Sequence, residues 1–468
     1  MKQLQAGIFT FLLLLTIISC KKTSSFIDSP DALLSLSTDT LHFETVFTST
    51  GSITQSFKIF NQNDQKLKLS AVKLMGGSSS SFKMNVDGSP GASFSNLEIQ
   101  PNDSIYVFVS VTINPNAANT PFIVQDSILI SYNGNNTYLQ LDAYGKNAHF
   151  LNGVRVTTDS TWTNDLPYVI LGNVTVDSNV TLTIQKGCKI FHHADAPFVV
   201  NGTLHINGEA PDSLRVAFAG DRLDEYYSDL PGSWPGIQFT SSSKNNMLNY
   251  ATIQNATNGI TTENWKTNEE KITLHQCIIN NCSDAGILSL NSRINAVNCL
   301  ISNCGGSNVS ITGGGKYAFD YCTVVTFGNF FIDHKKPVLA ISDADENGLS
   351  SSIEAVFTNC IFYGDNGIVN NEVEINKEGT SFLVKFDNVL YYNQDSQMAL
   401  TEQNSIRNED PAFVNIDISK RIFDFNLKNI SKAINAGIVI PGIVVDLDGK
   451  PRIDATSGKP DLGCYENQ

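Results

Sequence analysis

Residues 274–282 read LHQCIINNC, and residues 296–304 read AVNCLISNC. The same pattern returns at residues 248–256 (LNYATIQNA), 319–327 (FDYCTVVTF), 357–365 (FTNCIFYGD) and 386–394 (FDNVLYYNQ). In every segment the first, fourth and sixth positions are apolar or small, whereas the second and third are mostly polar. Such columns indicate an internal repeat, because each unit places the same type of side chain at the same structural position.

The repeat predicts a parallel β-helix. An apolar residue three places before another breaks the alternation of a single strand, so two short strands should meet at a tight turn with both apolar ends inside. Asn recurs at the third position and tolerates the left-handed backbone that such a turn needs. The segments begin 22 to 38 residues apart, close to one coil each except at one insertion. A leucine-rich repeat would need a Leu-x-x-Leu-x-Leu pattern, which is missing, and an antiparallel sandwich would show no such columns.

Cysteine fills two of these columns. The fourth position holds Cys277, Cys299, Cys322 and Cys360, and the ninth position holds Cys282 and Cys304. Residues of one column stack at the spacing of neighbouring strands, about 4.8 Å, and a buried thiol behaves as a small apolar side chain. We therefore expect free cysteines packed inside the solenoid. Disulfides are the alternative, and a metal site is disfavoured because the spacing is Cys-x4-Cys with only His275 nearby.

Residues 31–147 precede the repeat and alternate with the period of two that marks half-buried strands. Residues 104–113 (SIYVFVSVTI) and 127–132 (SILISY) are examples, and turn-forming clusters such as residues 133–136 (NGNN) separate them. A region of this length with about seven strands predicts an immunoglobulin-like (Ig-like) β-sandwich. Residues 139–146 (LQLDAYGK) resemble the last strand of Ig-like modules in bacterial surface proteins, which implies a spacer or contact module rather than an enzyme.

The first twenty residues read MKQLQAGIFTFLLLLTIISC. The apolar run is about half of the ~20 residues that a membrane-spanning helix needs, so residues 1–19 are predicted to be a signal peptide. The ending resembles the lipobox of bacterial lipoproteins, which implies that Cys20 is lipidated and that residues 20–30 form a short tether. An ordinary signal peptide with a chance cysteine is the alternative. Lys21 and Lys22 stand where many inner-membrane lipoproteins carry a retaining Asp, so we expect a cell-envelope location at the outer membrane.

Composition restricts the partners. The formal net charge is −15 with only 16% charged residues, which argues against nucleic acid or anionic lipid because phosphate groups would be repelled. No second apolar run reaches spanning length, so membrane attachment is expected only through the lipid on Cys20. The surface should instead be rich in hydroxyl and amide groups.

Residues 148–425 resemble the right-handed parallel β-helix of the pectate-lyase-like superfamily. The opening coils of that fold are similar to residues 174–191 (VTVDSNVTLTIQKGCKIF) and 198–210 (FVVNGTLHINGEA). Residues 426–468 are interpreted as a C-terminal cap of the β-helix. Within them, DLDGKPR and PDLGCYE resemble the closing DxDGxxR…PDxGxYE signature of bacterial β-helix surface lipoproteins, with Cys464 where Ala is usual. The resemblance implies an all-β architecture and much less about chemistry.

Residues 343–354 read DADENGLSSSIE and satisfy the calcium-loop pattern D-x-[DN]-x-[DN]-G-x5-E. Asp343, Asp345, Asn347 and Glu354 are the candidate ligands, because carboxylate and amide oxygens suit Ca²⁺ and a glycine allows the sharp turn. The loop lies in the long insertion between two repeats and has no predicted flanking helices. A solvated acidic loop is therefore the alternative. Calcium is the one cofactor that the sequence suggests.

The sequence favours a non-catalytic cell-envelope lipoprotein that presents its β-helix surface to a polysaccharide or to another envelope protein. A polysaccharide lyase or glycoside hydrolase on the same scaffold is the alternative. Hydrolases of this kind use paired carboxylates, yet the repeat contains no Asp-Asp pair. Lyases need a base, and residues 333–336 (DHKK) are a candidate basic cluster beside the acidic loop. The favoured alternative is that they are only the polar start of the same insertion. No catalytic residue is assigned. Converging charged side chains in a groove would favour the enzyme, and a Ser, Thr and Asn face would favour binding.

Overall fold

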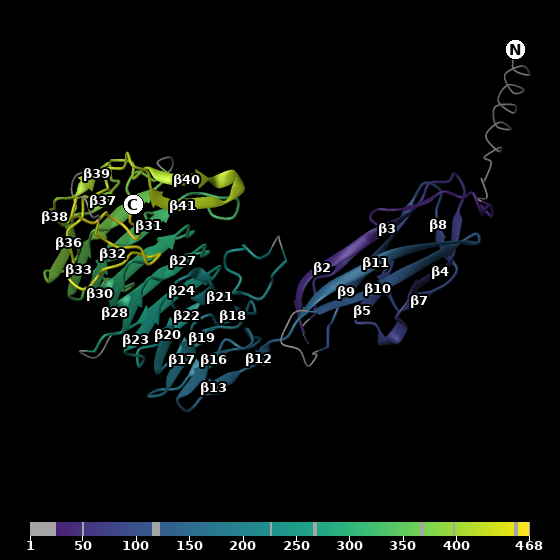
Figure 1. Ribbon diagram of the computed structural model, residues 1–468, viewed down its shortest axis with the longest axis horizontal. Coiled ribbons are helices and arrows are strands. Elements are labelled where there is room, and N and C mark those ends of the chain that lie inside the picture. The colour runs from purple at the N-terminus through teal and green to yellow at the C-terminus, as the bar shows by residue number, and fades with distance from the viewer. Residues whose placement is uncertain are drawn as a thin grey trace, which may run out of the picture. The chain divides into compact units, whose positions relative to one another are not determined.

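The structure is a computed structural model that describes residues 25–48, 51–114, 122–224, 227–264, 269–365, 369–395, 398–453 and 457–467. The predicted signal peptide and Cys20 therefore lie outside the described residues. Residue contacts divide the chain into two compact units, Met1–Asn147 and Ala148–Gln468 (Figure 1). The prediction of an all-β chain is confirmed: the described helices are the three-residue 3-10 turns η1 (Gly77–Ser79), η2 (Asp212–Leu214) and η3 (Ile418–Lys420). In these ranges, no helix has the length and apolar character needed to span a bilayer.

The first unit is an Ig-like sandwich of two sheets whose alternating apolar side chains meet in one core. One sheet has the order β1 (Leu34–Leu36), β3 (Gln55–Asn61), β9 (Ser104–Val111), β5 (Phe82–Val86) and β6 (Ser89–Pro90). The other has the order β2 (Thr40–Phe47), β11 (Asn135–Lys146), β10 (Phe122–Tyr132), β4 (Leu67–Leu74) and β7 (Ser93–Phe94), with β8 (Leu97–Ile99) also paired to β4. Neighbouring strands are antiparallel except β2 and β11, which run parallel.

Residues 25–30, which the sequence assigned to the tether, are held against this sandwich. The backbone N–H of Ile27 donates to the carbonyl of Lys66 at 2.9 Å. The side-chain amide of Asn133 donates to the carbonyls of Ile27 at 2.8 Å and Ser29 at 3.0 Å. Asn135 donates in the same way to the carbonyl of Pro30 at 2.7 Å. Residues 25–30 thus belong to the sandwich and do not form a free tether.

The second unit is a parallel β-helix, as predicted, with three ladders of parallel strands around an apolar core. The first ladder contains β13 (Val154–Val156), β16 (Val174–Val176), β19 (Phe198–Val200), β22 (Ile237–Phe239), β25 (Ile260–Glu263), β28 (Ile287–Val297), β30 (Val309–Asp320), β32 (Leu339–Ser342) and β35 (Val373–Asn376). The second contains β14 (Ser160–Trp162), β17 (Thr181–Gln185), β20 (Thr203–Asn207), β23 (Asn246–Asn249), β26 (Ile272–His275), the later halves of β28 and β30, β33 (Ile353–Thr358), β36 (Phe382–Asp387) and β38 (Thr401–Gln403).

The third ladder completes each coil. It contains β12 (His149–Leu151), β15 (Tyr168–Ile170), β18 (Lys189–His192), β21 (Val216–Gly220), β24 (Ala251–Gln254), β27 (Ile278–Asn280), β29 (Leu300–Ser302), β31 (Thr323–Thr326), β34 (Ile361–Gly364), β37 (Leu390–Tyr391) and β39 (Ile406–Arg407). Because β28 and β30 run through both of the first two ladders without a break, those two ladders form one continuous 17-stranded sheet.

The bend between the second and third ladders lies at the third position of the repeat, as predicted. The six residues there have positive φ angles: Tyr250 48°, Gln276 50°, Asn298 53°, Tyr321 53°, Asn359 55° and Asn388 54°. This left-handed conformation is uncommon for residues other than Gly and is most readily adopted by Asn. The bend directs the fourth position of every segment into the core.

The cysteine columns pack inside the solenoid, and the expectation of free thiols is confirmed. All eight cysteines from Cys188 to Cys464 are buried and free. Their thiols contact backbone carbonyls of neighbouring coils: the Sγ of Cys277 lies 3.2 Å from the oxygen of Leu248, and that of Cys360 lies 3.3 Å from the oxygen of Phe319. Burial raises the pKa of Cys299 well above its ordinary value, so this thiol stays protonated and unreactive.

The C-terminal segment (residues 410–453 and 457–467) lies along the outer face of the third ladder (Figure 1). It begins with a hairpin of β40 (Phe413–Asp417) and β41 (Ile422–Leu427). Asn298, Asn359 and Asn388 at the left-handed bends donate side-chain hydrogen bonds of 2.7–2.8 Å to its carbonyl groups. Strands such as β31 are consequently buried on both faces. The described part of residues 426–468, expected as a cap, thus belongs to a lateral cover that spans several coils. This cover also includes β40 and the start of β41, which were expected in the β-helix.

We expect Cys299→Asp to prevent folding, whereas Cys299→Ala should be tolerated. An unpaired carboxylate in the core costs several kcal/mol, but the loss of one buried sulfur should cost only about 1–2 kcal/mol. Urea unfolding followed by circular dichroism measures both changes in the free energy of unfolding. Equal losses from Ala and Asp would contradict simple packing and would indicate a covalent or ligand role for this thiol.

Candidate functional site

The acidic loop of residues 343–354 does not gather its carboxylates around one point. The carboxylate of Asp343 is buried and accepts hydrogen bonds from the backbone N–H groups of Glu378 and Gly379, each at 2.8 Å. Its oxygens therefore secure a turn of the next coil. Among the described residues, no group of three or more His, Cys, Asp and Glu side chains is placed to hold a metal ion.

The other predicted ligands have different partners. Asp345 accepts from the backbone N–H groups of Asn347 and Leu349, both at 2.9 Å, and so closes its own turn. These bonds, first among them the one from Leu349, lower the pKa of Asp345. Glu354 lies on β33 and forms an ion pair of 2.9 Å with Lys316 on β30. The oxygen atoms of the candidate ligands therefore do not form a calcium cage in this arrangement.

The basic cluster of residues 333–336 is also divided. The ammonium of Lys335 pairs with Asp333 at 2.5 Å on the surface. His334 turns inward and is buried. A base cluster beside the acidic loop is thus not assembled, but the buried imidazole meets two other carboxylates.

His334 bridges Asp365 and Glu372. Its Nδ1 lies 2.5 Å from Oδ1 of Asp365, and its Nε2 lies 3.2 Å from Oε2 of Glu372. The side chains of His334 and Glu372 are 1% and 0% exposed, whereas that of Asp365 is 21% exposed. Both ring nitrogens face carboxylates, which suits an imidazolium that donates to each. We call these three residues the Asp365–His334–Glu372 cluster.

Burial and charge act in opposite directions within this cluster. Burial alone would lower the pKa of His334, but the hydrogen bonds and charges of Glu372 and Asp365 outweigh it and raise the pKa above its ordinary value. Burial raises the pKa of Glu372, against the opposing effect of His334. Both shifts favour the protonated forms, so the buried pair holds its protons to a higher pH than the separate groups would.

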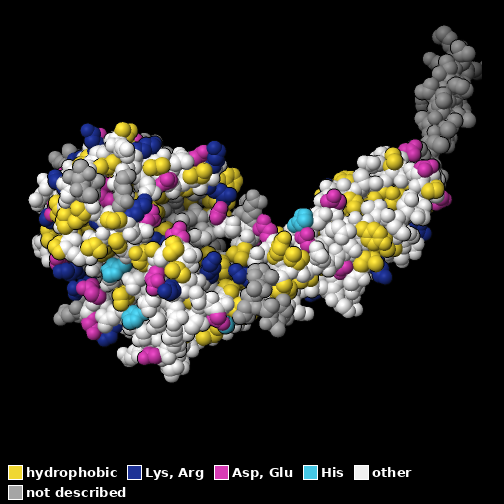
Figure 2. Space-filling view, in the orientation of Figure 1, with side chains coloured by type: hydrophobic (Ala, Val, Ile, Leu, Met, Phe, Trp, Pro, Cys, Tyr) yellow, Lys and Arg dark blue, Asp and Glu magenta, His cyan; other side chains and the backbone are white. Residues whose placement is uncertain are grey.

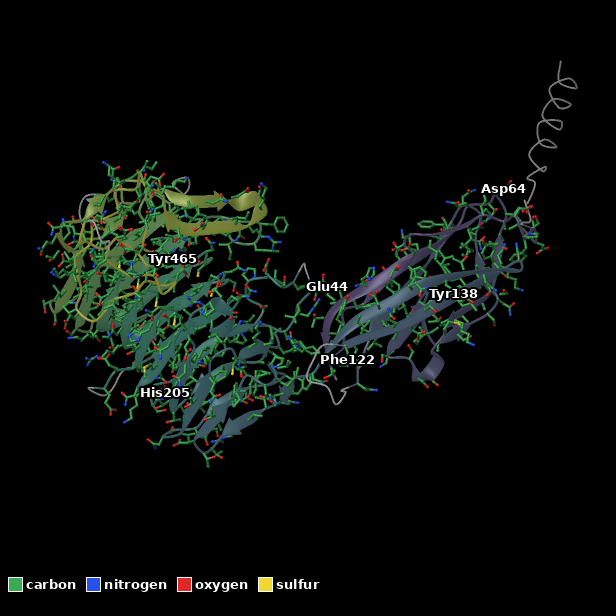
Figure 3. All side chains as sticks on the ribbon, in the orientation of Figure 1. Glu44, Asp64, Phe122, Tyr138, His205 and Tyr465 are labelled. Atoms are coloured by element: carbon green, nitrogen blue, oxygen red, sulfur yellow. The ribbon has the colours of Figure 1, made fainter. Side chains whose placement is uncertain are left out.

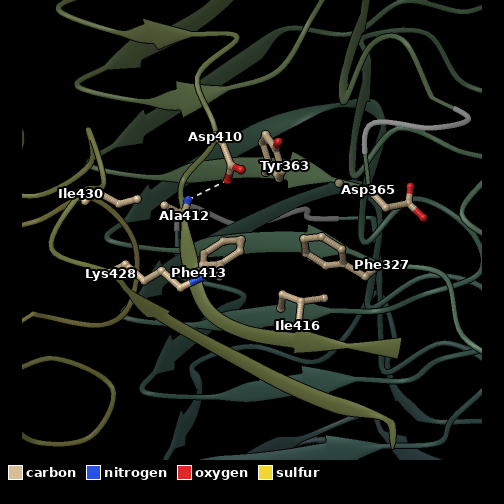
Figure 4. A pocket seen from close by; sticks show the side chains of 10 residues that line it. Phe327, Tyr363, Asp365, Asp410, Ala412, Phe413, Ile416, Lys428 and Ile430 are labelled. Atoms are coloured by element: carbon tan, nitrogen blue, oxygen red, sulfur yellow. Dashed lines mark hydrogen bonds between the residues drawn. The ribbon is translucent and has the colours of Figure 1, made fainter. Parts of the chain in front are cut away.

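Asp365 is also among the residues that line a pocket of about 480 Å³, which we call the outer pocket (Figure 4). Such a volume is in the range that small-molecule sites occupy. The third ladder and the loop that follows it contribute Phe327, Tyr363, Gly364 and Asp365, and the C-terminal segment contributes Asp410, Ala412, Phe413, Ile416, Lys428 and Ile430.

The outer pocket combines aromatic and charged side chains. The ring of Phe327 lies 6.2 Å from that of Phe413 and 6.5 Å from that of Tyr363, measured between centroids. Asp365 and Asp410 bring carboxylates from different chain segments (Figure 4). Asp410 is oriented by the backbone N–H of Ala412, which donates to its Oδ1 at 2.7 Å.

The outer pocket was not among the predicted sites, although the repeat carries a signal of it. The eighth position holds Asn in four of the six segments, followed in three of them by a small residue, as in Asn281-Cys282. Two segments lack this Asn and have Thr326-Phe327 and Gly364-Asp365 instead. Three of these four residues line the outer pocket. Departures from a repeat therefore marked one wall of the site, while Asp410 and Lys428 had no comparable signal.

The C-terminal signature builds a buried network rather than part of the pocket. The guanidinium of Arg452 is fully buried and pairs with Glu466 at 3.3 Å. It also donates to the side-chain oxygen of Asn298 at 2.5 Å and to the carbonyl of Cys464 at 3.0 Å. The ring of Tyr321 lies 4.3 Å below it. The motif thus fastens the C-terminal segment to the left-handed bends.

Comparison with known proteins found only partial structural likenesses. No family model matches the chain, and no curated protein matches it. A family 123 glycoside hydrolase from Clostridium perfringens aligns with a TM-score of 0.18 and 15% identity, over 27% of this chain and 26% of the hydrolase. A PapD-like domain of human CEP192 aligns with a TM-score of 0.17 and 10% identity, over 24% of this chain and 84% of that domain. These partial likenesses do not bear on activity.

We expect Ca²⁺ to leave the melting temperature unchanged. Asp343, Asp345 and Glu354 already have hydrogen-bond or ion-pair partners, so a cage would require each to give them up. A bound ion at a hundredfold excess over its Kd would stabilise the fold by about 2.7 kcal/mol. Thermal unfolding with and without millimolar Ca²⁺ measures the effect, with Mg²⁺ and chelator as controls. A clear rise that Asp345→Ala abolishes would show that the loop rearranges into a calcium site.

Proposed function

We propose that this chain is a lipid-anchored cell-envelope protein that binds a glycan without cleaving it, with the outer pocket as the binding site. The observation that supports the proposal is the meeting of aromatic rings and carboxylates in one pocket. The C–H face of a sugar ring packs on aromatic side chains, and its hydroxyl groups donate hydrogen bonds to carboxylate oxygens. Phe327, Tyr363 and Phe413 supply the first kind of contact, and Asp365 and Asp410 supply the second.

The charges around the pocket favour a neutral sugar over a uronic acid. Asp365 and Asp410 both present negative oxygens, and Lys428 is the single cationic side chain among the described lining residues. A uronate would bring a further negative charge against two carboxylates, which is unfavourable at short range. A polysaccharide lyase needs cations that neutralise the uronate carboxylate, so this arrangement disfavours that alternative.

A glycoside hydrolase is the second candidate, because Asp365 and Asp410 place two carboxylates in one pocket. A hydrolase needs one carboxyl group that carries a proton for the leaving oxygen. Asp365 instead receives a hydrogen bond from the ring of His334, and Asp410 receives one from a backbone N–H. Both carboxylates are thus prepared to accept hydrogen bonds, which favours binding over acid catalysis.

The outer face of the second ladder is also consistent with a binding role. Thr183, His205, Thr273 and Asn295 project outward from four strands of this ladder, and Figure 3 labels His205. Several charged side chains on the solenoid are paired between neighbouring coils, as in Arg293–Glu270 at 2.6 Å. Charged side chains of both signs are scattered over the visible surface, together with hydrophobic side chains (Figure 2). Such a face offers hydroxyl and amide contacts instead of converging acids or bases.

Isothermal titration with neutral and acidic oligosaccharides tests the binding proposal. Cellohexaose, laminarihexaose and mannohexaose form the neutral set, and oligogalacturonate and oligoalginate form the acidic set. We expect binding within the neutral set and about a tenfold loss with Asp410→Asn, since a hydrogen bond to a charged group contributes about 1.5–3 kcal/mol. Asp165→Asn is the matched control, because this exposed carboxylate of the first coil does not line the pocket.

The same samples separate binding from catalysis. New reducing ends would indicate a hydrolase, and new unsaturated ends would indicate a lyase. Exclusive binding of the acidic set, or equal binding by wild type and Asp410→Asn, would contradict the proposed site.

Attachment to the membrane is tested separately with Cys20→Ala. Removal of the acylated thiol should move the protein from the membrane fraction to a soluble or uncleaved form, because the lipid is the proposed anchor. Sucrose-gradient fractionation of the wild-type envelope should place the protein with the outer membrane. If the variant still sediments with membranes after a high-salt wash, the lipid is not what holds it.

A further inference from the structure

We propose that His334 is a positioning residue for the outer pocket: its protonated ring holds Asp365 in the orientation that accepts a hydrogen bond from a sugar hydroxyl. The inference rests on the proposed function and assigns its regulation to one buried side chain. His334 itself does not line the pocket. It acts through Asp365.

The carboxylate of Asp365 is held at both oxygens. Oδ1 faces Nδ1 of His334 at 2.5 Å, and Oδ2 accepts from the backbone N–H of Gly328 at 3.2 Å. Two contacts of this kind restrict the rotation of the side chain about its last bond. The remaining lone pairs are those that a ligand in the pocket would meet.

The ring of His334 is in turn fixed from behind. Glu372 is fully buried and faces Nε2 of the ring at 3.2 Å. The second oxygen of Glu372 has no hydrogen-bond partner in the structure. Its charge is compensated first by His334 and to a lesser degree by the backbone N–H of Val338. Gly364 leaves the necessary room: a Cβ atom there would lie 2.2 Å from both Oε1 of Glu372 and Cε1 of His334. The cluster therefore occupies a space that only a glycine at position 364 allows.

This arrangement makes binding depend on pH in a definite direction. The charged groups in contact with the ring are Asp365 and Glu372, and both are negative when ionised. They raise the pKa of His334 above its ordinary value, so the ring keeps its proton to a higher pH than a free imidazole does. The contribution of the pair is fully present below the ordinary His pKa and is lost as pH rises through the raised value. A neutral ring can donate to only one carboxylate, and Asp365 then loses its orientation or Glu372 loses its hydrogen bond from the ring.

Titration of the full-length mature protein at pH 6 and pH 9 with the neutral oligosaccharides tests this inference. For wild type we expect about a tenfold weaker affinity at pH 9. His334→Gln should bind weakly and equally at both values, because an amide does not titrate there. Asp365→Asn should also bind weakly and equally at pH 6 and pH 9. This second variant tests the inference if His334→Gln fails to fold. His193→Gln is the matched control, because His193 pairs with Asp221 at 2.8 Å but does not line the pocket.

Histidine-selective ¹⁵N NMR gives a readout without any sugar. The His334 ring should titrate above the ordinary His range in wild type and at a lower pH in Asp365→Asn. Sugar binding that is equal at pH 6 and pH 9 would overturn the inference while the proposed function stands. A His334 ring that is unaffected by Asp365→Asn would also overturn it. The absence of binding by any neutral sugar at either pH would overturn the proposed function itself.

Discussion

The left-handed bend between the second and third ladders is the constraint on which the solenoid depends. It turns the chain within one or two residues and directs the next side chain, often a cysteine, into the core. The same bend leaves the amides of Asn298, Asn359 and Asn388 outside, where they hold the C-terminal segment against the third ladder. That segment supplies Asp410 and Phe413 to the outer pocket. A backbone preference thus contributes to the formation of the outer pocket.

The periodic part of the molecule could be predicted from the sequence, and the pocket could not. Asn359 and Cys360 repeat what Asn298 and Cys299 do one or more coils earlier, so their positions follow from the period alone. The outer pocket joins β34 to a segment some fifty residues later, and lateral docking of that kind leaves no period. Residues 333–336 stood out as a polar run, but only packing decides that His334 turns inward while Lys335 stays at the surface.

The closeness of acidic residues in the sequence was a poor guide to which carboxylates lie together in the structure. Asp343 and Asp345 are close together in a calcium-loop pattern, yet the carboxylates of both accept hydrogen bonds from backbone N–H groups. Short acidic side chains readily close turns in this way, and that use competes with metal binding. Asp365 and Asp410 lie far apart in the chain but line the same pocket. The proximity that matters for chemistry arises from the stacking of coils and from the segment that covers them.

If Cys20 carries the proposed lipid, the docking of residues 25–30 on the sandwich limits how far the sandwich can lie from the bilayer. An extended chain spans at most about 3.5 Å per residue, so the six steps from Cys20 to Phe26 reach about 20 Å. A lipid on Cys20 would hold the edge of β4 within that distance of the bilayer surface, whichever path the connecting residues take. The short connection from Cys20 would then give the Ig-like sandwich little freedom to move away from the bilayer. The edge of the sandwich that contacts residues 25–30 would stay close to the lipid headgroups.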